Sequence, residues 1–189
     1  MLSLPARVRE ACEAGIRAVQ LREKDLPASE LFGLATELRE VTASYGAALI
    51  INDRVDIALA VGADGVHCPE NGFPPDRAAS LLGKESLVGA STHSLPAAQR
   101  ASARGVDYIM YGPVFSTASK PGEPQGLNEL RKICEGVDLP VFAVGGVTPE
   151  RARACLDCGA SGVAVVSALM NTRNIAHTTR EFETALGRL

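Results

Sequence analysis

The sequence predicts an α/β protein folded as a (β/α)8 barrel, the TIM-barrel architecture. Short apolar runs alternate with helix-length amphipathic stretches, which is typical of parallel strands covered by helices. Polar residues follow these runs at many separate points of the chain. A barrel gathers the ends of all its strands on one face, whereas an open sheet concentrates its ligand groups at one switch point. The scattered polar residues therefore favour the barrel.

The expected strands are short and rich in Val, Ile, Leu or Ala, and lie at 18–21, 48–51, 65–67, 87–90, 108–111, 141–144 and 162–166. The expected helices lie at 6–14, 28–45, 53–61, 96–104, 127–134, 149–158 and 175–188. Ser94 and Thr148 precede prolines at helix starts, so we expect their hydroxyls to cap those helices. A recurring turn with Gly62, Gly105 or Gly159 at the helix exit leads into the next strand.

Only seven strands are visible, and a helix precedes the first of them. The first place of the barrel would then be unfilled, leaving backbone groups of strands 18–21 and 162–166 without partners. We therefore expect either that Met1 is a truncated start or that a neighbouring chain covers the opening.

Composition places the chain among single-domain proteins, with one domain over residues 1–189. It has 46% hydrophobic and 22% charged residues, and its net charge of −3 offers no basic excess for nucleic acid. No signal peptide and no apolar run of about 18 residues is present, so no membrane association is expected. Five scattered cysteines indicate reduced thiols and a cytoplasmic protein. Cys155 and Cys158 form a C-x-x-C inside a helical pattern, for which helix packing is favoured over redox chemistry or half a zinc site.

Two groups of residues suggest anion binding. Gly146 lies in a glycine pair at a strand end, and Ser167 follows the last strand, where barrels commonly hold a phosphate. Gln20, Arg22 and Lys24 alternate at another strand end, so an anion between them would relieve their repulsion. Tight turns and solvated charges are the structural alternatives.

Asn52 and Asp53 end the second strand. A carboxylate beside cations and a phosphorylated ligand suits Mg2+, which takes one or two protein carboxylates and fills its shell with phosphate oxygens and water. Asp53 could equally cap a helix beginning at Arg54.

The longest irregular stretch, 112–126, contains hydroxyls and a cation suited to a pyrophosphate: Thr117, Ser119 and Lys120. His67 and His93 lack metal-ligand spacing, so each is expected to be packed or hydrogen-bonded.

These residues resemble the thiamine phosphate synthase family and its close relative, the thiazole tautomerase of thiamine biosynthesis. The resemblance rests on motifs in order along the chain: VQLREK at 19–24, IND at 51–53, ADGVH at 63–67, GASTH at 89–93, DYIMYGPVF at 107–115 with TASK at 117–120, AVGG at 143–146 and GASGVAVVS at 159–167.

The resemblance implies a transferase that joins hydroxymethylpyrimidine diphosphate to a thiazole phosphate, releasing pyrophosphate. It assigns the pyrimidine diphosphate to Gln20, Arg22, Lys24, Asn52, Thr117, Ser119 and Lys120. It assigns Mg2+ to Asp53, the thiazole phosphate to Gly146 and Ser167, and a place beside the reacting groups to Ser91. Lys24, Ser91 and Lys120 would be catalytic. The expected partners are small phosphorylated substrates, with a homo-oligomer possible.

Two positions depart from the family patterns. The synthases carry a second Mg2+-binding aspartate where this chain has Gly72, with Glu70 nearby, and the tautomerases carry a histidine where it has Pro113. The alternatives to a synthase are therefore a tautomerase or a non-catalytic barrel that binds phosphorylated ligands.

Overall fold

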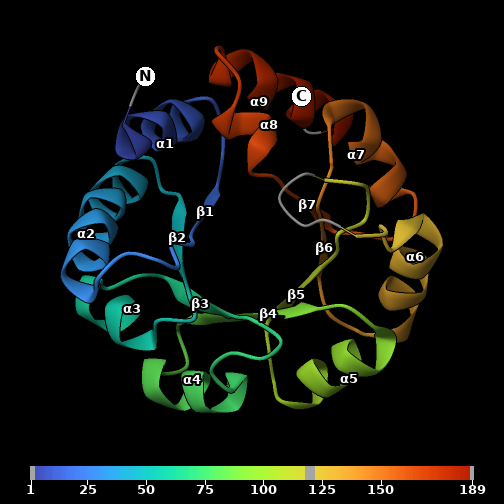
Figure 1. Ribbon diagram of the computed structural model, residues 1–189, viewed down its shortest axis with the longest axis horizontal. Helices are drawn as coiled ribbons and strands as arrows, with labels where there is room; N and C mark the ends of the chain where they lie inside the picture. Colours follow the sequence, from blue (N-terminus) through green and yellow to red (C-terminus); the bar gives the residue numbers. More distant parts are fainter. Residues whose placement is uncertain (1–2, 118–121, 188–189) are drawn as a thin grey trace.

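The computed structural model describes residues 3–117 and 122–187, and its centre is one parallel sheet. Seven strands follow one another in sequence order around a common axis (Figure 1). They are β1 (Ala18–Leu21), β2 (Ala48–Asn52), β3 (Gly65–Cys68), β4 (Leu87–Thr92), β5 (Tyr108–Tyr111), β6 (Val141–Val144) and β7 (Gly162–Ala164). All seven predicted strands are confirmed, and over the described residues the fold is that of a (β/α)8 barrel with seven of its eight strands.

The helices lie outside the strands (Figure 1). They are α1 (Leu4–Glu13), α2 (Ala28–Ser44), α3 (Val55–Val61), α4 (Pro75–Leu82), α5 (Leu95–Ala103), α6 (Gly126–Gly136), α7 (Pro149–Leu156), α8 (Ser167–Met170) and α9 (Ile175–Ala185). Helices α4 and α8 were not predicted. Across the described residues, no helix is long and apolar enough to cross a membrane.

Side chains of each strand alternate between the helical layer and the barrel interior. In β2, Leu49 and Ile51 are fully buried in a cluster with residues of α2 and α3. The intervening residues face inward, where β3, β5 and β6 contribute a cluster of three rings. The Tyr108 ring lies 5.7 Å from the ring of His67 and 5.7 Å from that of Phe142, centroid to centroid. The interior is thus a packed core, as in other barrels of this kind.

The predicted helix-to-strand turns are confirmed. Gly62, Gly105 and Gly159 all have positive φ, which glycine adopts at helix ends without steric cost. Aspartates two residues after Gly62 and Gly105 form hydrogen bonds with backbone N–H groups at the start of neighbouring strands. Asp64 accepts a hydrogen bond from the Leu49 N–H, and Asp107 accepts one from the Val88 N–H, each at 2.7 Å. This end of the barrel therefore serves stability.

The two predicted helix caps have different outcomes. The Ser94 hydroxyl accepts a hydrogen bond from the Ala97 N–H at 3.3 Å, as expected. The Thr148 prediction is wrong: its hydroxyl caps no backbone group and instead donates to the Glu150 carboxylate at 2.6 Å. Cys155 and Cys158 are buried free thiols, in agreement with the packing interpretation, and burial raises the pKa of Cys155 to about 11.

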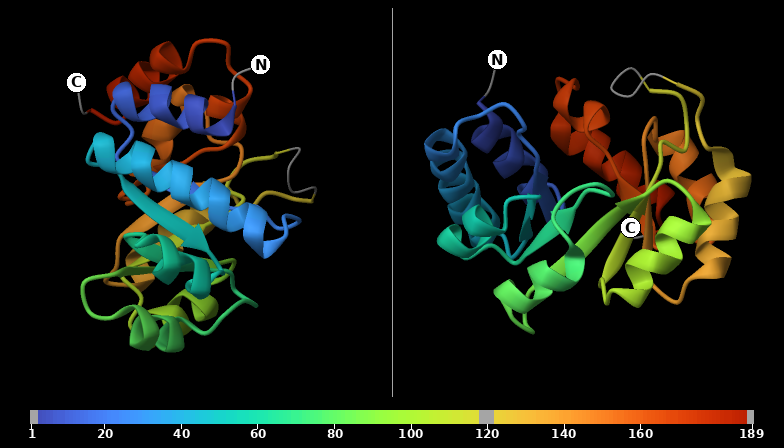
Figure 2. Two further views of the ribbon diagram at one scale, coloured as in Figure 1. Left: turned by 90° about the vertical axis from the view of Figure 1, so that its left-hand side faces the viewer. Right: turned by 60° about the horizontal axis from the view of Figure 1, so that its bottom comes forward.

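The barrel is closed by helices rather than by strand pairing. Within the described residues no ladder joins β7 to β1. Instead α1 packs beside α9, as Figures 1 and 2 show from different directions. Arg7 of α1 reaches across, with Nη2 donating to the carbonyl oxygens of Leu169 at 2.6 Å and Thr172 at 2.9 Å. This guanidinium links the first helix to the chain after β7.

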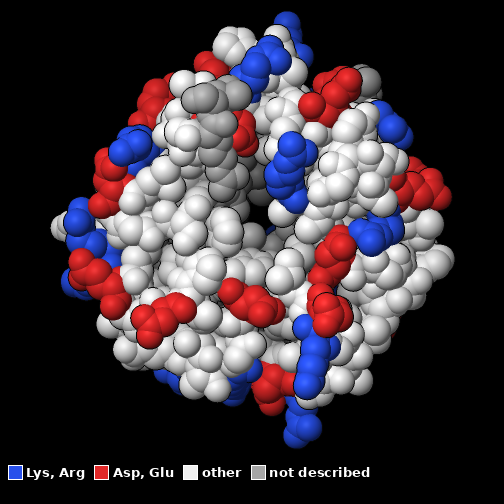
Figure 3. Space-filling view, turned by 180° about the vertical axis from the view of Figure 1, so that it is seen from behind, with Lys and Arg blue, Asp and Glu red and all other residues white. Residues whose placement is uncertain are grey.

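Seen from behind, the molecule is hollowed at its centre. Basic and acidic side chains alternate around the rim of this face, and neither sign gathers into one patch (Figure 3). A mixed surface of this kind has no strong single-sign field. This face therefore offers no single-sign patch to attract an anionic ligand.

Candidate active site at the strand ends

The diphosphate residues predicted at the end of β1 do not all belong to the strand. Gln20 lies in β1 and faces inward, with its Nε2 3.7 Å from the Met110 Sδ of β5 on another side of the barrel. The strand ends at Leu21, so Arg22 and Lys24 lie in the loop that follows, and both are exposed. The alternation expected for all three therefore stops at the strand end.

Asp53 joins the end of β2 to the loop that precedes α4. It has a φ of 63°, and its Oδ1 accepts a hydrogen bond from the Phe73 N–H at 2.8 Å. Helix α3 begins at Val55, with Arg54 at its N-cap position and no side-chain cap. The structural alternative, a helix cap by Asp53, is therefore wrong.

Gly72 packs directly against this carboxylate. A Cβ at position 72 would collide with Asp53 Oδ1 and with the Pro69 ring, so any side chain there would have to displace one or both of these groups. Position 72 thus cannot supply a second carboxylate in this arrangement. Glu70, the other acidic residue of the loop, has its Oε2 4.0 Å from the His93 Nδ1.

A line of three polar groups runs inside the barrel from β5 through β3 to β4, and of these His67 is buried while Tyr108 and Ser91 are half-buried. The His67 Nδ1 is 3.3 Å from the Tyr108 hydroxyl, and its Nε2 is 2.7 Å from the Ser91 hydroxyl. His67 is 1% exposed. Burial, assisted by the Arg22 charge, lowers its pKa to about 4, so the ring is neutral at physiological pH. The expectation of a hydrogen-bonded histidine is confirmed.

Gly89 leaves the space that the Tyr108 ring occupies. A Cβ at this position would collide with the Tyr108 ring, which lies over the backbone of β4. Burial also raises the pKa of Tyr108, so the phenol keeps its proton. Sequence reasoning assigned no role to Tyr108, because its neighbours depend on the register between strands.

The Gly145–Gly146 turn follows β6 and is packed tightly from one side. Gly146 has a φ of 64°, and a Cβ on it would collide with the carbonyl oxygen of Ser116. From α7, Arg151 Nη1 donates to the Gly146 carbonyl at 2.9 Å, and its guanidinium lies 5.0 Å from the centre of the Phe115 ring. Ser167 is exposed at the start of α8. Sequence reasoning missed Arg151, whose role arises from tertiary contacts.

The remaining predicted residues lie in the loop after β5. Thr117 is half-buried and makes an interaction of its own. Ser119 and Lys120 lie outside the described residues. Their assignment to a diphosphate stays a prediction.

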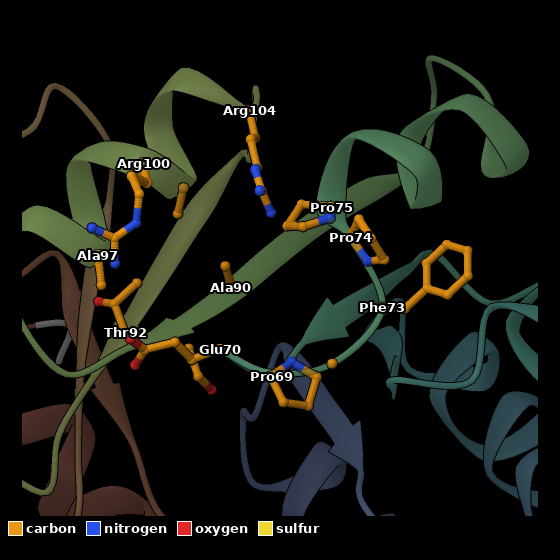
Figure 4. A pocket seen from close by; sticks show the side chains of 13 residues that line it. Pro69, Glu70, Phe73, Pro74, Pro75, Ala90, Thr92, Ala97, Arg100 and Arg104 are labelled. Atoms are coloured by element: carbon orange, nitrogen blue, oxygen red, sulfur yellow. The ribbon is translucent and has the colours of Figure 1, made fainter.

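A cavity of about 170 Å³ lies outside the barrel, between α4 and α5 (Figure 4). The loop after β3 lines one side, and Arg100 of α5 and Arg104, the residue that follows this helix, lie along another. Ser91 is the only member of the predicted site among its lining residues. This cavity therefore does not coincide with the predicted site.

The described residues contain no group of three His, Cys, Asp or Glu side chains able to hold a metal ion. Asp53 offers one carboxylate, of which Oδ1 is already engaged by the Phe73 N–H. Such a donor set fits Mg2+ only when ligand phosphate oxygens and water complete the shell.

Comparisons with known proteins agree on one family. The family model described as thiamine monophosphate synthase matches residues 2–169. A putative thiamine-phosphate synthase of Geobacter sulfurreducens is 48% identical over 169 residues, which are 88% of this chain and 79% of that protein. The thiamine-phosphate synthase of Moorella thermoacetica is 42% identical over 183 residues, 96% of this chain and 87% of its own.

Solved structures give the same result. The thiamine phosphate pyrophosphorylase from Pyrococcus furiosus superposes with a TM-score of 0.90 at 38% identity, covering 98% of this chain and 90% of that one. A 3-hexulose-6-phosphate synthase, 18% identical with a TM-score of 0.71, shares the fold alone.

Proposed function

The chain belongs to the thiamine monophosphate synthase family of transferases, and we propose that it couples hydroxymethylpyrimidine diphosphate to a thiazole phosphate, releasing pyrophosphate. The observation that carries this proposal is the family match over residues 2–169, which spans every motif of the predicted site. The inward-facing and loop residues at the strand ends support it.

The diphosphate is assigned to the cations and hydroxyls of two loops. Arg22 and Lys24 follow β1 as cations close in the sequence, and Lys120 falls between β5 and α6 in the sequence. An anion between such cations removes their mutual repulsion and gains charge-assisted hydrogen bonds. Gln20, Asn52, Thr117 and Ser119 supply neutral donors and acceptors around it.

Asp53 is the residue assigned to Mg2+, with diphosphate oxygens completing the shell. Bound there, Mg2+ would neutralise charge that develops on the departing pyrophosphate. The hydrogen bond from the Phe73 N–H fixes Asp53 Oδ1, which orients the carboxylate before ligand arrives.

The reaction needs no protein nucleophile. The bond between the pyrimidine methylene carbon and the diphosphate oxygen breaks, and its electron pair leaves with pyrophosphate. The thiazole nitrogen then gives its lone pair to that carbon. The protein's task is to stabilise the leaving group by directed charges and donors, among them Lys24, Ser91 and Lys120. The thiazole phosphate is assigned to Gly146 and Ser167.

A tautomerase is the second candidate, favoured by one observation: Gly72 leaves no room for the second aspartate of the synthase pattern. Against it, the residue after Gly112 is Pro113, which cannot transfer a proton. We place the enzyme in the cytoplasm, where its thiols stay reduced. A homo-oligomer stays a prediction.

The deciding experiment supplies the purified chain with both substrates and Mg2+ and measures pyrophosphate release and thiamine phosphate. Turnover supports the synthase. Aromatisation of the thiazole carboxylate phosphate without Mg2+, in place of coupling, would support the tautomerase. Ligand binding with neither reaction would leave a binding protein and refute both enzymes.

A further inference from the structure

The line from Tyr108 through His67 to Ser91 has a definite hydrogen-bond direction. The three residues lie on the adjacent strands β5, β3 and β4, and His67 at the centre contacts both neighbours. Because the neutral imidazole carries one hydrogen, only one of its nitrogens donates and the other accepts.

The two imidazole tautomers give the Ser91 hydroxyl opposite hydrogen-bond roles toward a ligand. If Nε2 accepts, the Ser91 hydroxyl must donate to His67 and presents only lone pairs to a ligand. If Nε2 carries the hydrogen, His67 donates to the Ser91 oxygen, and the hydroxyl hydrogen of Ser91 is free to face the ligand. The contact that Nδ1 makes with Tyr108 decides between them.

The surroundings of Tyr108 settle the direction. In the described part of the chain, the only hydrogen-bond partner of its hydroxyl is the His67 Nδ1. Tyr108 is half-buried inside the barrel, and an O–H left there without a protein acceptor costs more than an unused lone pair. The phenol therefore donates to Nδ1, which places the imidazole hydrogen on Nε2, 2.7 Å from the Ser91 oxygen.

We propose that Tyr108 and His67 are positioning residues that make Ser91 a hydrogen-bond donor toward the ligand, through the directed line Tyr108 to His67 to Ser91. The ligand group that Ser91 meets is then an acceptor. This inference rests on the proposed function for its identity: an oxygen of the departing diphosphate. Each hydrogen bond in such a line polarises the next, which strengthens the final donor.

The tautomer can be read directly in the ligand-free protein by 15N NMR of labelled histidine. We expect the wild-type His67 to show a protonated Nε2 and an unprotonated Nδ1. Tyr108→Phe keeps the ring on Gly89 and removes the hydroxyl, so this preference should weaken. A protonated Nδ1 in the wild type would overturn the proposal.

Kinetics test whether the line acts through Ser91. His67→Met should lower kcat for coupling about 10- to 100-fold, with little change in the KM of either substrate. His67→Gln should recover much of this loss, because its amide can donate from a similar place. In a Ser91→Ala background, His67→Met should cause no further loss.

The matched control is Thr92→Val. Thr92 follows Ser91 in β4, is 1% exposed, and its hydroxyl has no hydrogen-bond partner among the described residues. This variant should keep wild-type kcat. The positioning role would be refuted if His67→Met lowered kcat as much in the Ser91→Ala background as in the wild type. It would also be refuted if His67→Met changed KM and left kcat unaltered. If the wild type shows no coupling, the proposed function fails, and the nitrogen spectra alone then decide the direction of the line.

Discussion

A single residue, His67, should make the free energy of unfolding depend on pH. Its pKa is about 4 in the folded protein, against 6.5 for an ordinary histidine. Between these values the unfolded state binds a proton that the folded state does not, so stability should fall as pH drops from 6.5 to 4, by at most about 3 kcal/mol. Urea unfolding at several pH values measures it. His67→Gln should remove this component, and an unchanged difference between pH 7 and pH 4 in that variant would contradict it.

Lys24→Ala tests the assignment of charge to the diphosphate. We expect coupling to fall roughly 30- to 1000-fold, because a charged hydrogen bond made chiefly in the transition state is worth about 2 to 4 kcal/mol. Affinity for the thiazole phosphate, measured by calorimetry, should change little. Lys84→Ala, an exposed lysine before β4, is the control. If Lys24→Ala weakened the binding of the pyrimidine diphosphate and of the thiazole phosphate equally, Lys24 could not be assigned to the diphosphate.

Asp53→Asn separates the metal role of this residue from its structural one. The asparagine keeps an oxygen that can accept from the Phe73 N–H, so the fold should persist. We expect activity to fall most at limiting Mg2+ and the Mg2+ concentration for half activity to rise. Mg2+ binding to the wild type without diphosphate should be weak, since one carboxylate is available. Full activity of the variant at limiting Mg2+ would exclude Asp53 as the ligand.

At the scale of elements, the turn after β6 depends on α7. Arg151→Met removes the hydrogen bond to the Gly146 carbonyl and the stacking on Phe115. The KM for the thiazole phosphate should rise about 5- to 20-fold, with a smaller change in kcat. Arg153→Met is the matched control, because Arg153 on the same helix pairs with Asp157 and, among the described residues, with no group of the turn. The same rise in both variants would show a general effect of helix charge.

Strands were predictable from sequence because apolar runs and glycine turns are local signals, whereas helices α4 and α8 and the cap of α7 were not. Helix α4 was missed because Pro74 and Pro75 suggest a loop, although the second proline fits the first helical turn. Ser94 and Thr148 share the pattern of a hydroxyl before proline, yet only Ser94 caps its helix. The difference is Glu150, whose carboxylate takes the Thr148 hydroxyl.

The candidate site also contains features that the sequence predicted and contacts that it could not predict. Alternation along a strand predicted that Gln20 faces inward, since only the chain's own periodicity is needed. The contacts of His67 with Ser91 and of Gly72 with Asp53 were not predictable, because they depend on register between strands and on the path of a loop.

For the whole molecule, the critical contact is the closure at Arg7. Arg7→Met leaves the carbonyls of Leu169 and Thr172 without this donor, so we expect a loss of about 2 to 4 kcal/mol in unfolding free energy. Chemical denaturation measures it. Arg9→Met, an exposed position on the same helix, should be near neutral. A neutral Arg7→Met would show that α1 and α9 hold the closure by apolar packing.

The agreement of sheet order with sequence order has a consequence for how the chain reaches its native state. Every strand pairs with its neighbour in the sequence, so the sheet can grow one unit at a time. The bonds from Arg7 to Leu169 and Thr172 join residues 162 and 165 positions apart. Closing so long a loop is entropically costly before other contacts hold it together. We therefore expect the seam at Arg7 to form late and to open early, so that weakening it should raise the unfolding rate more than it lowers the folding rate.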